Sequence, residues 1–256
     1  MIHVTNHELS FVFGLLGNIV SFVAFLSPIP TFRDIYKKKS SGGYHSVPYI
    51  IALCSATLLL YYGNLKPNGL LIISINSLGC AIEISYLIVY LIYAPRKEKR
   101  FTLSLILLLN VGAYGTVILV AHFLLTGHKR IAAVGWICAA YNLAEFVAPL
   151  SIIKKVITTK SVEFMPVSLS FSLTLCATMW FFYGFFIKDI FIAVPNVVGI
   201  SSGVTQIIVY FLYRGSNQKI TEATTSETHA AQPEQTAEVT IVVQSKSVES
   251  IESDIV

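Results

Sequence analysis

The chain has 256 residues, of which 54% are hydrophobic and only 12% are charged, and its mean hydropathy is +0.69. A soluble domain carries about 25% charged residues, so this chain has too little charge to cover a water-exposed surface. The composition argues against a soluble enzyme, a disordered scaffold and a secreted disulfide-rich module. It predicts a protein that crosses a membrane several times.

Seven charge-poor stretches follow one another along the chain. Each is long enough for a membrane-spanning helix, which needs about 20 mostly apolar residues. The stretches are apolar throughout and do not alternate with polar residues, so we expect helices rather than the strands of an outer-membrane barrel. They cover residues 9–32, 40–65, 67–95, 101–128, 131–153, 164–187 and 190–213.

Lys and Arg are distributed unevenly over the segments that connect these stretches. The loops after the first, third and fifth stretches, with the segment after the seventh, hold 13 of them, whereas the opposite loops hold 4. Cytosolic loops of membrane proteins carry the excess of Lys and Arg. The sequence therefore predicts an N-terminus outside and a C-terminus in the cytosol. The plasma membrane is the expected location, with an internal membrane as the alternative.

The last segment, residues 216–256, differs in composition from the rest. It is rich in Ser, Thr, Glu and Gln and holds 7 of the 14 acidic residues, which predicts a disordered cytosolic tail. Whether this tail is phosphorylated is left open. The residues before this tail carry a net positive charge because Lys and Arg gather in the cytosolic loops. Membrane topology therefore accounts for the charge, and we expect no nucleic-acid partner. The expected partners are the lipid bilayer and a small molecule, and a homo-oligomer is left open.

The sequence predicts neither a cofactor nor a metal site. The four cysteines, at positions 54, 80, 138 and 176, fall inside predicted spans without a CxxC pair or a His or acid at ligand spacing. The chain has no Walker loop, no GxGxxG after a strand, no GxSxG and no HExxH. We therefore expect no catalytic residues and no enzymatic activity.

The chain repeats itself with a shift of 121 residues. Matches at this many positions indicate two copies of one unit rather than coincidence. The matching pairs, the last with a shift of 120 residues, are Pro28 with Pro149, Lys39 with Lys160, Tyr62 with Tyr183 and Asn76 with Asn196.

The repeat predicts the domain organisation. Residues 1–93 form a first triple-helix repeat, 94–130 a linker helix with its flanking loops, and 131–215 a second triple-helix repeat. Three helices and one linker make an even number of crossings, so the two copies have the same orientation. The expected fold is an all-α membrane protein with seven transmembrane helices, arranged as a 3+1+3 parallel repeat of triple-helix bundles with helix 4 as the linker.

Two groups of repeat-related residues point to a function. Repeats of this kind place a substrate site at their interface near the membrane midplane, and Asn76 and Asn196 carry amides that could bind one small polar ligand there. Helix–helix hydrogen bonding is the other interpretation of these amides. The prolines near the cytosolic ends of the helices, where each could bend a helix, predict hinges for alternating access. They are Pro28, Pro48, Pro149 and Pro166.

Longer motifs of the chain resemble the SWEET family of plant sugar transporters over about residues 9–213. The motifs in the second half are the more specific, and the resemblance is to the subgroup usually associated with sucrose. It implies a facilitative bidirectional uniporter for sucrose, hexoses or both, which alternates between outward-open and inward-open states without ion or ATP coupling. The motifs are Gly17-Asn18, Val47-Pro48-Tyr49, Ile75-Asn76-Ser77, Ala148-Pro149-Leu150-Ser151, the run from Lys160 to Pro166, the run from Trp180 to Gly184, and Pro195-Asn196.

The resemblance also implies roles for individual residues. The two asparagines would hydrogen-bond sugar hydroxyls, Trp180 would present a flat apolar face to the sugar ring, and the four prolines would act as hinges. The polar wall of the sugar site matches Ser21, Ser55 and Asn142. An outer gate matches Tyr62, Lys66 and Asp189, although for Tyr62 an anchor at the membrane interface is an equal alternative.

Three positions depart from the family pattern. Leu59 stands where a second tryptophan is usual, Cys176 where a serine is usual, and Glu145 where an apolar residue is usual. We include Cys176 and Glu145 in the expected substrate site. A carboxyl group at membrane depth is costly and is by default a functional hypothesis.

Two other functions are weighed against the sugar uniporter. One is a proton-coupled or amino-acid-exporting relative with a PQ loop that uses Glu145. The other is a seven-helix receptor, which the topology allows. The 121-residue duplication and the lack of DRY-like and NPxxY-like motifs argue against the receptor.

Overall fold

The computed structural model describes residues 5–145, 147–162, 165 and 167–214, and every regular element in this part of the chain is helical. Among these residues, seven helical stretches, each of one to three consecutive elements, are long and apolar enough to cross a membrane. This confirms the all-α class and the seven predicted spans. The predicted tail, residues 216–256, lies outside the described residues.

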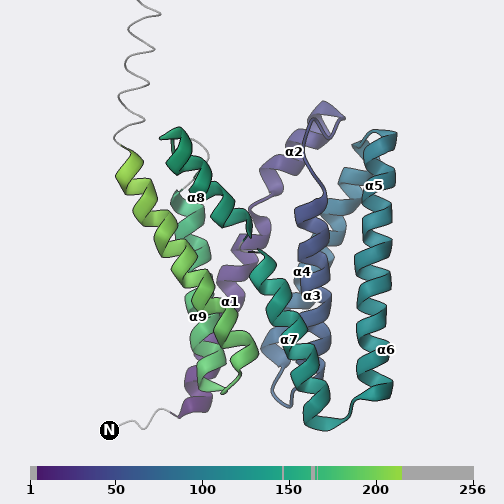
Figure 1. The fold of residues 1–256 in the computed structure, drawn as a ribbon, viewed down its shortest axis with the longest axis vertical. Coiled ribbons are helices and arrows are strands. Elements are labelled where there is room, and N and C mark those ends of the chain that lie inside the picture. The colour runs from purple at the N-terminus through teal and green to yellow at the C-terminus, as the bar shows by residue number, and fades with distance from the viewer. Residues whose placement is uncertain (1–4, 146, 163–164, 166, 215–256) are drawn as a thin grey trace, which may run out of the picture.

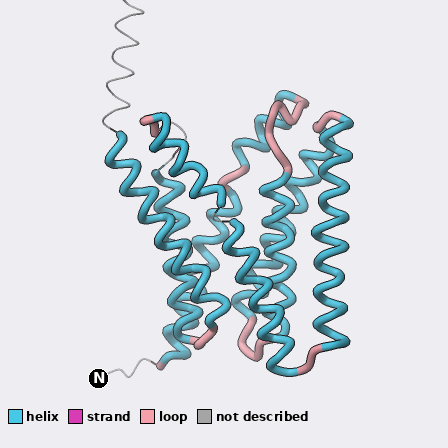
Figure 2. The backbone as a smooth tube through the Cα atoms, in the orientation of Figure 1, coloured by secondary structure: helices cyan, strands magenta, loops and turns pink. Residues whose placement is uncertain are grey.

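The helices are joined by short connections, as Figures 1 and 2 show. In chain order they are α1 (Asn6–Leu26), α2 (Ile29–Lys38), α3 (Val47–Leu65), α4 (Leu70–Tyr93), α5 (Arg96–Ile106), the π-helix η1 (Leu107–Ala113), α6 (Tyr114–Leu124), α7 (Gly127–Glu145), α8 (Val147–Thr159), α9 (Val167–Phe186) and a final helix, Ile190–Arg214.

The first span is broken near its end. α1 ends at Leu26, and α2 begins at Ile29 in a new direction, with Pro28 between them. Proline has no N–H and cannot continue the hydrogen-bond ladder of α1. After this break the chain is helical as far as Lys38, although the segment after residue 32 was expected as a loop because of its lysines. The fifth span comprises α7 and α8, and residue 146 between them lies outside the described residues.

Helices from the two predicted repeats pack against each other. α1 packs along α9, and α7 packs along α3, while α3 and α4 form a closely packed pair within the first repeat. Gly17 permits the close approach of α1 to α9, because a Cβ atom there would lie 3.1 Å from Cε2 of Trp180. The helices on the two sides diverge toward the end formed by α2, α5 and α8 (Figure 1).

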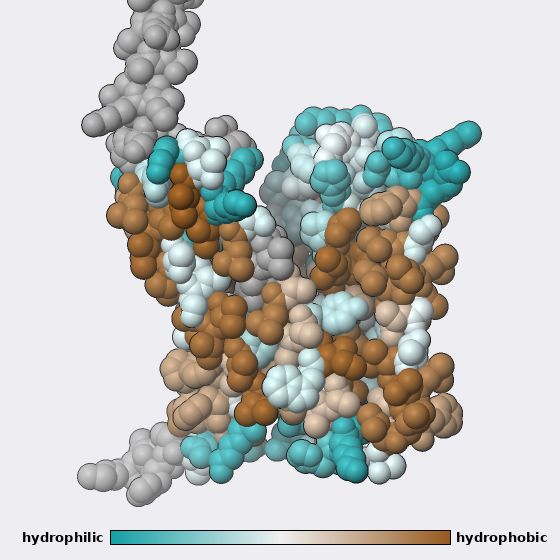
Figure 3. Space-filling view, viewed as in Figure 1, coloured by the Kyte–Doolittle hydropathy of each residue, from teal (hydrophilic) through white to brown (hydrophobic). Residues whose placement is uncertain are grey.

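Many large apolar side chains lie on the outer surface of the molecule. Figure 3 shows hydrophobic residues in a broad band and hydrophilic residues at both ends. The linker formed by α5, η1 and α6 contributes to this band, with Leu107, Leu108, Phe123 and Leu124 all more than 60% exposed. An exposed apolar surface of this extent suits lipid rather than water.

Local structure recurs at positions 120 to 121 residues apart. Lys39 and Lys160 both have left-handed backbones, with φ of 52° and 56°. The Nζ of Lys39 donates to the hydroxyl of Tyr93 at 3.2 Å, and that of Lys160 donates to the hydroxyl of Tyr213 at 3.1 Å. These pairs support the sequence repeat, whose boundaries at residues 93, 130 and 215 stay a prediction.

Candidate functional site

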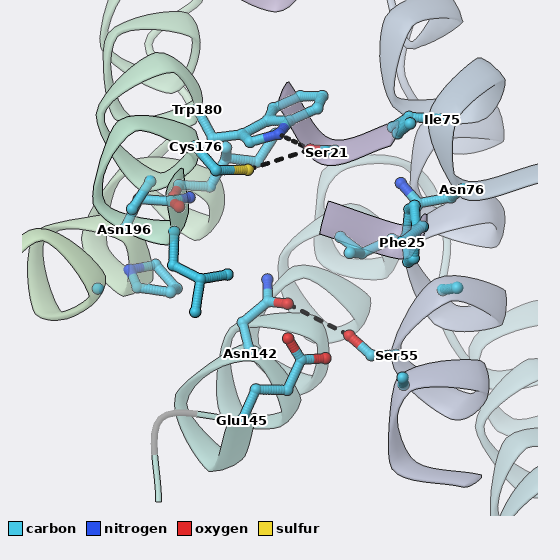
Figure 4. A pocket seen from close by; sticks show the side chains of 18 of the residues that line it. Ser21, Phe25, Ser55, Ile75, Asn76, Asn142, Glu145, Cys176, Trp180 and Asn196 are labelled. Carbon is cyan, nitrogen blue, oxygen red and sulfur yellow. Dashed lines mark hydrogen bonds between the residues drawn. The ribbon is translucent and has the colours of Figure 1, made fainter. Parts of the chain in front are cut away.

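A cavity of about 430 Å³ lies between the two halves. This volume falls within the range of roughly 300–1,000 Å³ typical of small-molecule sites. All eight residues predicted to bind substrate line it, and Figure 4 shows their side chains. They come from α1, α3, α4, α7, α9 and the final helix and are Ser21, Ser55, Asn76, Asn142, Glu145, Cys176, Trp180 and Asn196.

The two repeat-related asparagines face the cavity from opposite sides (Figure 4). The amide nitrogen of Asn76 donates to the carbonyl of Ile72 at 2.8 Å, and that of Asn196 donates to the carbonyl of Ile192 at 2.7 Å. Each bond uses one of two N–H groups and fixes the amide against its own helix. The second N–H and Oδ1 of each amide suit a ligand with donors and acceptors.

Trp180 is held in place by α1. Its Nε1 donates to Oγ of Ser21 at 2.9 Å, and the Sγ of Cys176 lies 3.1 Å from the same Ser21 oxygen. The indole also packs edge-on against Tyr183, with ring centroids 5.3 Å apart. Ser21 therefore orients the indole as well as lining the cavity, a role the sequence did not reveal.

Asn142 and Glu145 extend from α7 on the opposite wall. The hydroxyl of Ser55 donates to Oδ1 of Asn142 at 3.2 Å. Glu145 is exposed, and its carboxyl group points into the cavity beside Ser55 and Asn142 (Figure 4). Leu59 lines the cavity as well, so an aliphatic side chain stands at the repeat mate of Trp180.

The three residues predicted as an outer gate meet away from this cavity, at the end where the α3–α4 and α9–final-helix turns lie. The hydroxyl of Tyr62 donates to Oδ2 of Asp189 at 2.7 Å, and Nζ of Lys66 lies 2.8 Å from the same oxygen. The Asp189 side chain has no exposed area, whereas that of Lys66 is 23% exposed. This gate cluster (Tyr62, Lys66 and Asp189) holds the two halves together at that end.

Asp189 has a second role in the gate cluster. Its Oδ1 accepts the backbone N–H of Phe191 at 3.0 Å, which caps the start of the final helix.

At the opposite end, Figure 3 shows a notch in the surface between α8 and the side of α2 and α5. The described part of the molecule is therefore closed at the gate cluster and open toward α2 and α8.

The predicted hinge prolines occupy different environments. Pro28 lies at the break between α1 and α2, whereas Pro48 is the second residue of α3. A proline in the first turn of a helix removes no intrahelical hydrogen bond. Pro149 lies in α8, and Pro166 is outside the described residues.

Sequence reasoning missed two polar lining residues on the final helix, Ser202 and Gln206. A signal was present, because a spacing of three or four residues places side chains on one helix face. Residues 196, 199, 202, 203 and 206 follow this spacing and are small or polar in a mostly apolar helix. No group of three or more metal-ligating side chains occurs among the described residues.

A membrane protein built from repeated helix bundles with a site between them has the architecture of a solute transporter. Residues 11–98 and 132–218 match the family described as "sugar efflux transporter for intercellular exchange". The two matched segments begin 121 residues apart, which is the offset of the repeat.

Known proteins are similar over most of the chain. It is 60% identical over 212 residues to the bidirectional sugar transporter SWEET9 of Arabidopsis thaliana, covering 83% of this chain and 82% of that one. It is 52% identical over 251 residues to the bidirectional sugar transporter NEC1 of Petunia hybrida, covering 96% and 94%. A solved eukaryotic SWEET transporter superposes with a TM-score of 0.77 at 32% identity, covering 82% of this chain and 99% of that one. The chain belongs to the SWEET family of sugar transporters.

Proposed function

We propose that this protein is a facilitative bidirectional uniporter that moves sucrose and hexoses across a membrane by alternating access. The observation that carries the proposal is the cavity between the two halves, lined by the repeat-related amides of Asn76 and Asn196. The names of its relatives as bidirectional sugar transporters support the same function. They do not favour a proton-coupled exporter or a receptor.

The lining of the cavity suits a sugar. A sugar presents hydroxyls around its edge and C–H groups on its ring faces. The amides and the hydroxyls of Ser21 and Ser55 can exchange hydrogen bonds with sugar hydroxyls, and the indole of Trp180 can cover a ring face. The cavity of about 430 Å³ has room for more than a single hexose ring, which supports a disaccharide as well as a hexose.

The two ends of the molecule suit alternating access. The gate cluster closes one end with a charged hydrogen bond and an ion pair, both to Asp189. The halves diverge at the other end (Figure 1). Opening the gate cluster while α2 and α8 approach each other would expose the same cavity to the opposite side, with Pro28 as one hinge.

We place the protein in the plasma membrane, with its N-terminus outside and its C-terminus in the cytosol. The end formed by α2, α5 and α8 carries most of the loop lysines and arginines, which supports a cytosolic position for that end. The structure then corresponds to an inward-open state.

Uptake and efflux of labelled sucrose and glucose in cells that lack endogenous carriers test this proposal. We expect both sugars to move in both directions down their gradients. A variant with both Asn76 and Asn196 changed to Ala, expressed at the same membrane abundance, is the control and should give background flux. Background flux of both sugars through the unaltered protein would contradict the proposal.

A further inference from the structure

Glu145 is the one charged side chain among the described residues that line the cavity. It is exposed there, and its carboxyl group points away from α7 toward the space between the two halves (Figure 4). The other polar lining groups are amides, hydroxyls and a thiol, which are neutral. The site therefore combines a neutral sugar-like lining with one acid.

No cation of the protein compensates this acid within the described lining. A carboxylate at membrane depth is costly unless an opposite charge or several hydrogen bonds offset it. The hydroxyl of Ser55 lies beside this carboxyl group, but it also donates to Oδ1 of Asn142 at 3.2 Å. A positively charged group on the transported molecule would supply the missing partner.

Glu83, on α4, is a second acid, but it lies outside the cavity lining. It is 4% exposed, and its Oε2 has no hydrogen-bond partner among the described residues. A carboxyl group buried in this way favours its neutral form. The negative charge that makes the cavity favourable for a cation is therefore that of Glu145, since the described lining has no basic residue.

Trp180 is compatible with the same ligand. It lies across the cavity from Glu145, and its indole is fixed by the bond to Ser21. The face of an indole attracts an ammonium group and also covers the C–H groups of a sugar ring. Neither interaction excludes the other.

We propose that the cavity recognises a protonated amino sugar, a polyhydroxylated ring with an ammonium group, and that the Glu145 carboxylate binds this ammonium. The amides of Asn76 and Asn196 hold the hydroxyls of the same molecule. This inference rests on the proposed sugar transport and specifies an additional substrate class for the same site.

Transport of three labelled sugars by the full-length protein in liposomes tests the inference. D-glucosamine differs from D-glucose by one ammonium in place of one hydroxyl, and N-acetyl-D-glucosamine carries the same nitrogen without charge. We expect a KM for glucosamine about tenfold lower than for glucose, as one charge-assisted hydrogen bond would give. N-acetylglucosamine should show no such advantage.

Two variants assign the effect to the cavity. Glu145→Gln keeps the size of the side chain and removes its charge, so within this variant the KM for glucosamine should rise to that for glucose. Glu98→Gln removes a carboxylate in the first turn of α5, outside the cavity, and should keep the advantage.

Equal KM values for glucosamine and glucose in the unaltered protein would overturn the inference. So would a glucosamine advantage that survives Glu145→Gln, or a Glu145→Gln effect seen only in the pH dependence of glucose flux, because a proton would then be the partner of Glu145. Glucose flux in the same liposomes reports on the proposed function separately. Its presence without the glucosamine advantage removes the inference alone.

Discussion

At the scale of single residues, the paired amides are the most direct test of the site. Changing Asn76 or Asn196 to Ala removes groups that can form hydrogen bonds to a sugar, each worth about 0.5–1.5 kcal/mol, and leaves sugar hydroxyls unpaired. We expect each variant to lower sucrose and glucose flux by about tenfold or more. Flux should be measured at equal membrane abundance of the protein.

Asn64 provides a matched control for these variants. Its amide also donates to a carbonyl four residues earlier, that of Leu60 at 2.7 Å, but it is exposed and lies outside the cavity. Asn64→Ala should leave flux near that of the unaltered protein. If Asn64→Ala lowers flux as much as the cavity variants do, the loss reflects helix stability and not sugar binding.

Several site residues could be predicted from the sequence because their types are unusual for their surroundings. An amide or an acid in an apolar stretch stands out, and the repeat or the family resemblance assigned positions such as Asn196 and Glu145. The orientation of Trp180 by Ser21 could not be predicted, because the two are 159 residues apart and meet only when α1 packs along α9. Ser202 and Gln206 were missed although their spacing with Asn196 was visible.

At the scale of helices, we expect the gate cluster to control how the two halves separate. Asp189→Asn keeps Oδ1 to cap the final helix, but an amide nitrogen replaces Oδ2, which accepts from Tyr62 and forms the ion pair with Lys66. We expect this variant to open the gate end more often. The measurement is the labelling rate of Cys138 by a membrane-impermeant thiol reagent in a variant without the other three cysteines, since Cys138 packs in the same core as Tyr62.

Labelling of Cys138 should be several times faster in Asp189→Asn than in the parent. Lys188→Gln is the control, because it removes an exposed charge one residue away without changing the gate cluster.

Asp189→Ala also removes the cap of the final helix, so its free energy of unfolding should be lower than that of Asp189→Asn by about 0.5–2 kcal/mol. Unchanged labelling in Asp189→Asn would show that the ion pair does not keep this end closed.

The prolines should differ in their effects. Pro28→Ala supplies an N–H at the break between α1 and α2, so the two helices can join into one. We expect a severalfold lower maximal rate of sugar exchange with little change in KM. Pro48→Ala, in the first turn of α3, should have a smaller effect on that rate.

Concentration-dependent exchange kinetics of both proline variants provide the check. A large rise of KM in Pro28→Ala at an unchanged maximal rate would argue for a binding role and against the hinge.

Two features of the helices could not be predicted from the sequence, the helical course of α2 and the π-helix η1. Lysines after residue 32 indicated a loop, and an apolar linker gives no sign of where its hydrogen-bond pattern changes.

At the scale of the whole molecule, the number of spans and the repeat were evident from the sequence because both depend on composition over long windows. Lipid requires long uninterrupted apolar helices, and charges accumulate between them. The packing of α1 along α9 and of α7 along α3 was not predictable, because apolar residues lie on several sides of these helices and no single face is marked as the contact. This packing is what places residues of both halves around one cavity.

Counterflow by the purified protein in liposomes tests the central claim most directly. The liposomes are loaded with unlabelled sucrose and diluted into a trace of labelled sucrose, without a gradient of pH or of other ions. A uniporter with alternating access should accumulate the label transiently above its outside concentration and then release it to equilibrium, in the same way when the sugar is glucose. Entry that only equilibrates without an overshoot, or accumulation that requires a pH gradient, would contradict the account.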